Sequence, residues 1–445
     1  MRRSRWVIAG TAAVLLAWLG QNRAALWQAA YPHLPRRAQA VPYVLRARLA
    51  LDAATPVPLP TAHMFVEAAV EDGGASPARG APTDSPGALR AFSPPAGRAP
   101  TSWSPSTPGS GSRDASAVQG EASTGPTPRP VEALPPLAPA VHLGPGPYEA
   151  QTWNNCGPAT ISMVLGRLGT ASGQAAAARV LKPDPDDKNV GPHELAAYAR
   201  SHGYGAIVRV NGDLERLRRL LAIGLPVIVE TWFVPSPGDE MGHYRVLVGY
   251  DDSSAHFIAD DSYNGPGVAL PYQTLDDLWR VFNRTYVVVY PLERETQVAL
   301  VLGDHVDERL MYLSAVARAL DENAERGDAF SFFNLGSALL GLGDADGAAG
   351  AYDRARALGL PWRMLWYQFG PFEAYAAVGR WHDVTALAAA NLRNAGNLEE
   401  SHYWLGRAHQ AEGDAEAAAD AWRTALRYNP TFAPAAEALA AAEGA

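Results

Sequence analysis

Between residues 147 and 295, apolar positions alternate between helical spacing and short strand-like runs. Apolar residues recur every three or four positions in the segments 155–168, 192–202 and 213–223, which predicts three helices. Runs rich in Val, Ile, Phe and Tyr predict strands at 226–233, 243–250, 256–260 and 285–290. Helices followed by strands predict one α+β domain over 147–295.

From residue 296 to 445 the pattern changes to Ala-rich helical segments separated by glycines. The glycines recur at intervals of 34 and 36 residues, in one set at Gly336, Gly370 and Gly406 and in a second set at Gly343, Gly379 and Gly413. Such a period predicts an all-α array of stacked helical hairpins. The region resembles tetratricopeptide repeats, which implies that it binds a protein or peptide.

The middle unit of this array departs from the pattern, because aromatic residues crowd its first half. They are Trp362, Trp366, Tyr367, Phe372 and Tyr375. We expect them to form core or to dock against the preceding domain; the alternative is that they line a groove for a peptide.

The N-terminal 146 residues lack this patterning. Arg2, Arg3 and Arg5 precede an apolar run that ends at Leu19, which predicts an export signal over residues 1–23. Both an uncleaved membrane anchor and a cleaved signal peptide remain open, and either exports the rest of the chain. Residues 52–147 hold 19 of the 36 prolines, so we expect 24–146 to be a mostly disordered linker.

Composition excludes several classes of protein. A single cysteine, Cys156, makes no intramolecular disulfide and supplies no thiolate zinc site, and we expect neither cofactor nor metal. The net charge of −9 gives no electrostatic reason to bind nucleic acid. Three carboxylates between Lys182 and Asn189 lack the spacing of a calcium loop, so that segment is predicted to be a solvated loop.

Cys156 lies at the predicted start of the helix 155–168. Backbone N–H groups and the dipole at a helix N-terminus stabilise a thiolate and lower the pKa of a thiol. Gln151 precedes it closely enough for the side-chain amide to help the Cys156 N–H hold a developing oxyanion. A lone cysteine in front of an apolar helix is also a common packing residue, so the chemistry needs a second element.

That element is a predicted hairpin whose first strand begins at His243. If Tyr250 pairs with His256 across the turn, His243 lies diagonal to Asp261 on one face of the hairpin. The two side chains then meet at the open end of the hairpin.

Asp261 in this position accepts a hydrogen bond from one ring nitrogen of His243, while the other nitrogen faces the thiol of Cys156. The assignment depends on register, because a one-residue change in turn length selects Asp260 instead. In the structural alternative, His243 and Asp261 only satisfy each other at the end of a strand.

Three segments in this order resemble the papain-like cysteine peptidases of family thirty-nine, the type that trims bacteriocin leaders. They run from Gln151 through Cys156-Gly157-Pro158, from Gly242-His243 to Tyr250, and from Asp261 to Pro266. The resemblance covers about a third of the chain. It departs from the family where Ser262 follows Asp261, since a proline is usual there.

The resemblance implies a papain-like fold, with the helix of Cys156 packed on an antiparallel sheet. It implies that Cys156 is the nucleophile, His243 the general base, Asp261 its orienting partner and Gln151 the oxyanion donor. Bacterial proteins that join such a domain to tetratricopeptide repeats are similar to both parts of the chain. The sequence therefore predicts an exported, thiol-dependent hydrolase of peptide or amide bonds; an inactive binding module and an acyl-transferring relative are the alternatives.

Overall fold

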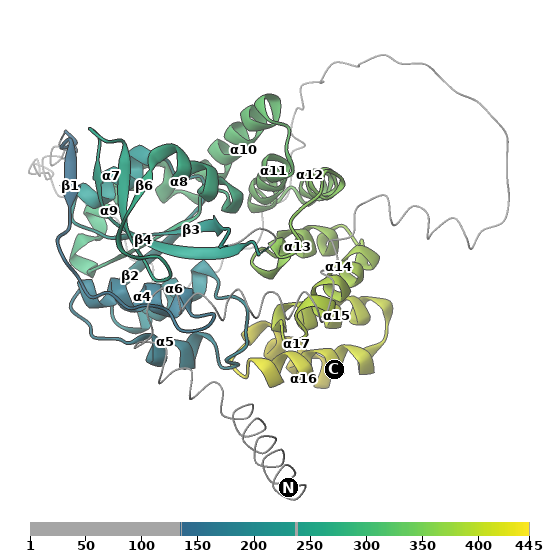
Figure 1. Ribbon diagram of the computed structural model, residues 1–445. Helices are drawn as coiled ribbons and strands as arrows, with labels where there is room; N and C mark the ends of the chain where they lie inside the picture. The colour runs from purple at the N-terminus through teal and green to yellow at the C-terminus, as the bar shows by residue number, and fades with distance from the viewer. Residues whose placement is uncertain (1–133, 135, 236–238, 445) are drawn as a thin grey trace, which may run out of the picture. The chain divides into compact units, whose positions relative to one another are not determined.

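A computed structural model describes residues 134, 136–235 and 239–444 (Figure 1). The predicted export signal and nearly all of the predicted linker lie outside these residues. Among the helices that are described, none combines the length and the apolar character that a membrane span requires.

Seven strands form one antiparallel sheet in the order β2-β7-β3-β4-β5-β6, and β1 pairs with β4 off this path. The strands are β1 (Ala140–His142), β2 (Gly205–Arg209), β3 (Val227–Phe233), β4 (Met241–Asp251), β5 (His256–Asp261), β6 (Gly265–Pro271) and β7 (Tyr286–Tyr290). The four predicted strands are present at β3, β4, β5 and β7. Strand β1 begins before residue 147, so the folded part of the chain starts earlier than predicted.

Three helices cover one face of the sheet, and Figure 1 shows them together on that side. They are α4 (Cys156–Arg167), α5 (Gln174–Leu181) and α6 (Pro192–Ser201). Ile161 and Leu165 of α4 are fully buried and pack with Ile228, Val246 and Val248 of the sheet. These contacts fix the helix of Cys156 against the central strands.

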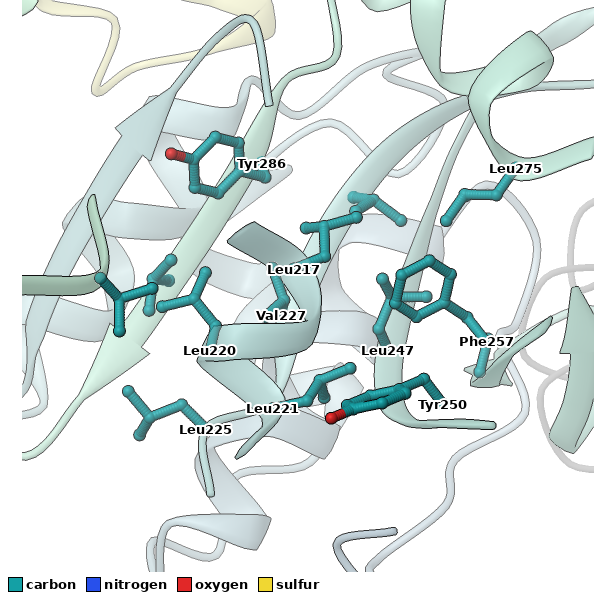
Figure 2. Packing of buried hydrophobic residues seen from close by; sticks show 14 of the residues in the cluster. Leu217, Leu220, Leu221, Leu225, Val227, Leu247, Tyr250, Phe257, Leu275 and Tyr286 are labelled. Atoms are coloured by element: carbon teal, nitrogen blue, oxygen red, sulfur yellow. The ribbon is translucent and has the colours of Figure 1, made fainter. Parts of the chain in front are cut away.

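Helices α7 (Leu214–Ala222), α8 (Tyr272–Trp279) and α9 (Glu295–Leu302) cover the opposite face. Leu217, Leu220 and Leu221 of α7 pack against Val227 and Leu247, as Figure 2 shows. Since successive side chains of a strand point to opposite faces, β3 and β4 supply both cores and read as continuous apolar runs. Helix α9 belongs to this core, so the core extends beyond the predicted boundary at residue 295.

The rest of the chain is helical. Its elements are α10 (Glu308–Glu325), α11 (Ala329–Gly341), α12 (Ala345–Leu358), α13 (Gly370–Ala377), α14 (Trp381–Asn394), α15 (Glu399–Glu412), α16 (Ala415–Tyr428) and α17 (Ala433–Glu443). We call α10–α17 the helical region and the part before it the α+β domain.

The two glycine sets have different structural reasons. Gly343, Gly379 and Gly413 have φ of +83°, +78° and +85° and lie in the turns after α11, α13 and α15, where residues with a Cβ are strained. Gly336 and Gly406 instead allow close packing, because a Cβ would lie 2.8 Å from Tyr352 and 2.4 Å from Trp422. The period in the sequence thus corresponds to recurring helical hairpins.

Candidate active site

Cys156 is the first residue of α4 and is partly exposed. A short turn precedes it, in which the Asn155 N–H donates to the Thr152 carbonyl over 3.2 Å and Asn154 takes a left-handed φ of 61°. Pro158 is accommodated because the first turn of a helix needs no intrahelical N–H donor. The thiol therefore lies where the N–H groups of α4 point, as the sequence predicted.

His243 and Asp261 meet across β4 and β5. Nε2 of His243 lies 2.9 Å from Oδ1 of Asp261, and the two side chains are 3% and 0% exposed. The backbone N–H groups of Tyr263 and Asn264 also donate to Oδ1, each over 2.9 Å. Burial opposes ionisation, but the His243 charge and these donors hold the pKa of Asp261 well below its ordinary value.

The predicted register of the hairpin is wrong at the turn and right at its open end. Tyr250 pairs with Phe257 rather than with His256, a shift of one residue. A bulge between Leu247 and Gly249 inserts one extra residue and reverses that shift. The carboxylate beside His243 is consequently the one that the sequence favoured.

Asp260, the alternative partner, points away from His243. Its Oδ2 accepts a hydrogen bond from Arg167 over 2.7 Å, and its Oδ1 accepts one from the Gly267 N–H over 3.1 Å. Since adjacent residues of a strand face opposite sides, only Asp261 reaches the imidazole.

The thiol of Cys156 and the imidazole of His243 lie close enough that each shifts the pKa of the other. Burial alone raises the pKa of Cys156, but the hydrogen bond and charge of His243 outweigh it, and the resulting pKa lies below its ordinary value. Burial lowers the pKa of His243, whereas the Asp261 charge and the hydrogen bonds to Asp261 and Cys156 bring it above its ordinary value. Both directions favour a thiolate beside an imidazolium. Because Nε2 is bonded to Asp261, Nδ1 is the nitrogen left for the thiol.

Gln151 joins this site from the loop before α4. Its side chain is 5% exposed, and its Oε1 accepts a hydrogen bond from the Ser262 hydroxyl over 2.8 Å. This leaves the other end of the amide, Nε2, as the donor. The four residues that the sequence selected are thus brought to one place in the fold.

Arg245 is a member of the site that the sequence did not indicate. Its Nε donates to Oδ2 of Asp261 over 2.9 Å, its Nη1 donates to the Thr231 hydroxyl, and it lies over the ring of Phe233 at 5.5 Å. The available signal was an arginine inside an apolar strand, two residues after His243 and hence on the same face.

The segment from Lys182 to Asn189 is exposed at residues 185 and 186, but it is not the fully solvated loop that was predicted. Lys182, Asp187 and Asn189 are 4%, 3% and 8% exposed. Nζ of Lys182 donates to the Asn154 carbonyl over 2.7 Å, and its charge contributes to the lowered pKa of Cys156. The prediction failed because the segment packs on the turn before Cys156, a contact that local polarity does not reveal.

A further carboxyl group, that of Glu230, lies near the thiol. Glu230 lies on β3 opposite Tyr244 and is 6% exposed. Burial, and then the charge of Cys156, raises its pKa well above its ordinary value. The raised pKa of Glu230 disfavours a further negative charge beside the thiolate.

The aromatic residues between α12 and α13 dock on the α+β domain. The ring of Tyr367 packs on Gly242, where a Cβ would lie 3.2 Å from it, and the Trp366 carbonyl accepts from Nδ2 of Asn189 over 2.6 Å. Arg363 Nη1 donates to Asp239 Oδ1 over 2.5 Å. The docking interpretation of these aromatics, rather than the groove, is the one that the contacts support.

Comparisons with known proteins agree with the peptidase-like character of the first domain. Residues 145–287 match the Peptidase_C39 like family. A double glycine motif protease from an AMS/PCAT transporter, in complex with its leader peptide, is 18% identical, with 33% of this chain and 92% of that chain covered and a TM-score of 0.26. Xylellain, a cysteine protease from Xylella fastidiosa, is 18% identical, with 35% and 87% covered and a TM-score of 0.24. No curated protein matches the chain.

Proposed function

We propose that the protein is a cysteine peptidase that hydrolyses a peptide or amide bond through an acyl-enzyme on Cys156. The observation that carries the proposal is the connected set of Cys156, His243 and Asp261, with the Gln151 amide beside them. The match of residues 145–287 to the Peptidase_C39 like family supports the same reaction class.

In the first half of the reaction, the Cys156 thiolate attacks the carbonyl carbon of the substrate. The oxygen becomes an oxyanion, which accepts hydrogen bonds from the Cys156 N–H and from Nε2 of Gln151. His243, as imidazolium, gives its proton to the leaving nitrogen, the carbon–nitrogen bond breaks, and a thioester remains on Cys156.

In the second half, His243 takes a proton from a water molecule, whose oxygen attacks the thioester. The carbon–sulfur bond breaks, the carboxylic acid product leaves, and the thiolate–imidazolium pair is restored. Asp261 stabilises the cationic imidazole and fixes its orientation throughout.

Activity is tested on the full chain with a mixture of unrelated peptides, and products are identified by mass spectrometry. We expect wild-type protein to cleave at least one peptide and Cys156→Ala to cleave none. Equal cleavage by the two proteins would overturn the proposal. An added amine that enters the product would instead identify an acyl transferase.

The thiol itself supplies a measurement that needs no substrate. We expect iodoacetamide to alkylate Cys156 well below the ordinary thiol pKa of about 8.5, and we expect His243→Ala to shift that profile to higher pH. A profile that rises only near the ordinary value and ignores His243 would favour an inactive binding module.

We further propose that the helical region consists of tetratricopeptide-type hairpins that bind a protein or peptide partner. The recurring helical hairpins and their small packing residues, Gly336 and Gly406, support this assignment. The basic and apolar N-terminal segment supports export of the protein to the extracytoplasmic face, either anchored or secreted.

A further inference from the structure

Ser262 lies between Gln151, the proposed oxyanion donor, and Asp261, the partner of His243. It follows Asp261 directly and is 1% exposed. Its carbonyl accepts a hydrogen bond from the backbone N–H of Gln151 over 2.9 Å, and its hydroxyl donates to Oε1 of the same residue over 2.8 Å. Two hydrogen bonds therefore join the strand that carries Asp261 to the loop that carries Gln151.

The hydroxyl contact holds the acceptor end of the Gln151 amide, Oε1, on Ser262. An amide has a donor end and an acceptor end of nearly the same shape, and only the donor end stabilises an oxyanion. With Oε1 accepting from Ser262, Nε2 is the end left for the substrate oxygen. The reversed amide would direct a carbonyl oxygen toward the negative charge on Cys156.

We propose that Ser262 is a positioning residue of the peptidase, which sets the orientation of the Gln151 amide for oxyanion binding. The inference rests on the proposed function.

The hydrogen bond between Ser262 and Gln151 is separate from the Cys156–His243 pair that generates the thiolate. His243 bonds Asp261 through Oδ1, and Arg245 bonds Oδ2, so neither depends on the Ser262 hydroxyl. Removing that hydroxyl should weaken oxyanion binding while the thiolate–imidazolium pair persists. This separation distinguishes positioning from general damage to the fold.

The first experiment measures two reactions of Cys156 in the full chain, because only one of them needs the oxyanion donor. A peptide aldehyde adds to the thiol and forms a hemithioacetal whose oxygen occupies the oxyanion position, whereas alkylation by iodoacetamide forms no oxyanion. We expect Ser262→Ala to bind the aldehyde about tenfold more weakly and to keep the wild-type pH profile of alkylation. Ser262→Thr, which retains the hydroxyl, should restore most of the affinity.

Two comparisons make the result specific. In a Gln151→Ala background, Ser262→Ala should have no additional effect, because the amide that it orients is gone. Ser172→Ala, which removes a hydroxyl bonded to Tyr198 over 3.1 Å outside the site, should leave aldehyde binding unchanged. Unchanged affinity in Ser262→Ala, or an equal loss with and without Gln151, would overturn the proposal.

Turnover is measured on the same variants. We expect Ser262→Ala to lower kcat for a cleaved peptide about tenfold with little change in KM, since the interaction is made only in the transition state. If wild-type protein binds the aldehyde but cleaves no peptide, the proposed function fails while the aldehyde series still decides the role of Ser262.

Discussion

The α+β domain and the helical region each bury an arginine against a carboxylate. Only in the α+β domain does that carboxylate also bind a group that changes its protonation state in the proposed reaction. Arg245 lies 2.9 Å from Asp261, which in turn binds His243. Arg356 of α12 is 1% exposed and lies 3.0 Å from Asp383, with the Tyr375 phenol at 2.9 Å.

The difference shows that the same ion pair serves stability in one place and chemistry in the other. In both places the guanidinium compensates a carboxylate that is costly to bury alone. Beside His243, however, the balance of charges also sets the pKa values of the imidazole and the thiol. What the pair contacts decides its role, and matched substitutions in the two regions separate the two effects.

The largest expected effect on activity is that of Asp261→Asn, and the adjacent Asp260, which faces the other side of β5, provides the control. Asp261→Asn removes the charge that raises the pKa of His243, so that pKa should fall and the pKa of Cys156 should rise. The pH range of activity should narrow from both sides, and kcat/KM should drop on the order of 100-fold or more. The pH dependence of kcat/KM and of alkylation measures both limbs.

Asp260→Asn is the control, because Asp260 binds Arg167 instead of His243. It should lower the free energy of unfolding without moving either limb of the pH profile. Equal pH profiles for the two variants would contradict the assignment of Asp261.

The second prediction compares the two buried arginines directly. Arg245→Met and Arg356→Met each remove one cation from a buried carboxylate, while Asp261 keeps His243 and Asp383 keeps Arg380. Each should therefore lower the free energy of unfolding, by less than the roughly 3–5 kcal/mol expected for a carboxylate left with no cation. The charge of Arg245 lowers the pKa of His243, so its removal should move the basic limb of the pH profile to higher pH. Arg356→Met should leave that limb in place, and denaturant titrations with alkylation profiles test both statements.

A shift of the basic limb in Arg356→Met would show that the helical region tunes the pKa of His243 through its own charges. The absence of a shift in Arg245→Met would show that Arg245 acts on stability alone.

The positions of some functional and capping residues were predictable from the sequence because local rules determine the helix starts and the strand register. Asp213 caps α7, as its position before an apolar helix predicts, with Oδ1 accepting from the Arg216 N–H over 2.7 Å. Helix α4 has no such side-chain cap, and its start is indicated instead by Pro158, which is favoured in a first helical turn. His243 and Asp261 were predictable because two alternating apolar strands joined by a short turn restrict the register to a few choices.

The remainder depends on contacts between distant segments. The bulge between Leu247 and Gly249 has no local signal, although it decides which aspartate reaches His243. Lys182 is polar and follows an Ala-rich helix, and only the fold shows that the turn before Cys156 covers it. The ion pair between Arg363 and Asp239 joins two regions that the sequence presents as separate.

The Arg363–Asp239 ion pair allows a test of whether the helical region affects the active site. Arg363 also donates to the Glu240 carbonyl over 3.1 Å, so it holds the backbone that leads into the strand of His243. Arg363→Asp should lower kcat/KM about fivefold, in keeping with a coupling of about 1 kcal/mol for a largely buried pair. The exchanged double variant, Arg363→Asp with Asp239→Arg, should recover part of the loss. No loss in the single variant, or no recovery in the double, would indicate that the helical region acts independently of the site.

The smallest expected effect concerns Lys182, the cation on the Cys156 side of the site. Burial lowers its pKa to about 8, so it is charged at neutral pH and loses its charge as the pH rises through that value. Its charge ranks after the contributions of His243 and of the Tyr244 backbone in lowering the pKa of Cys156. Lys182→Met should therefore raise the midpoint of Cys156 alkylation by less than about one pH unit, whereas Lys182→Arg, which keeps the positive charge, should leave the midpoint as in the wild type. A shift of the midpoint in Lys182→Met as large as that in Asp261→Asn would contradict this order. The lysine would then stabilise the thiolate as strongly as the His243–Asp261 pair does.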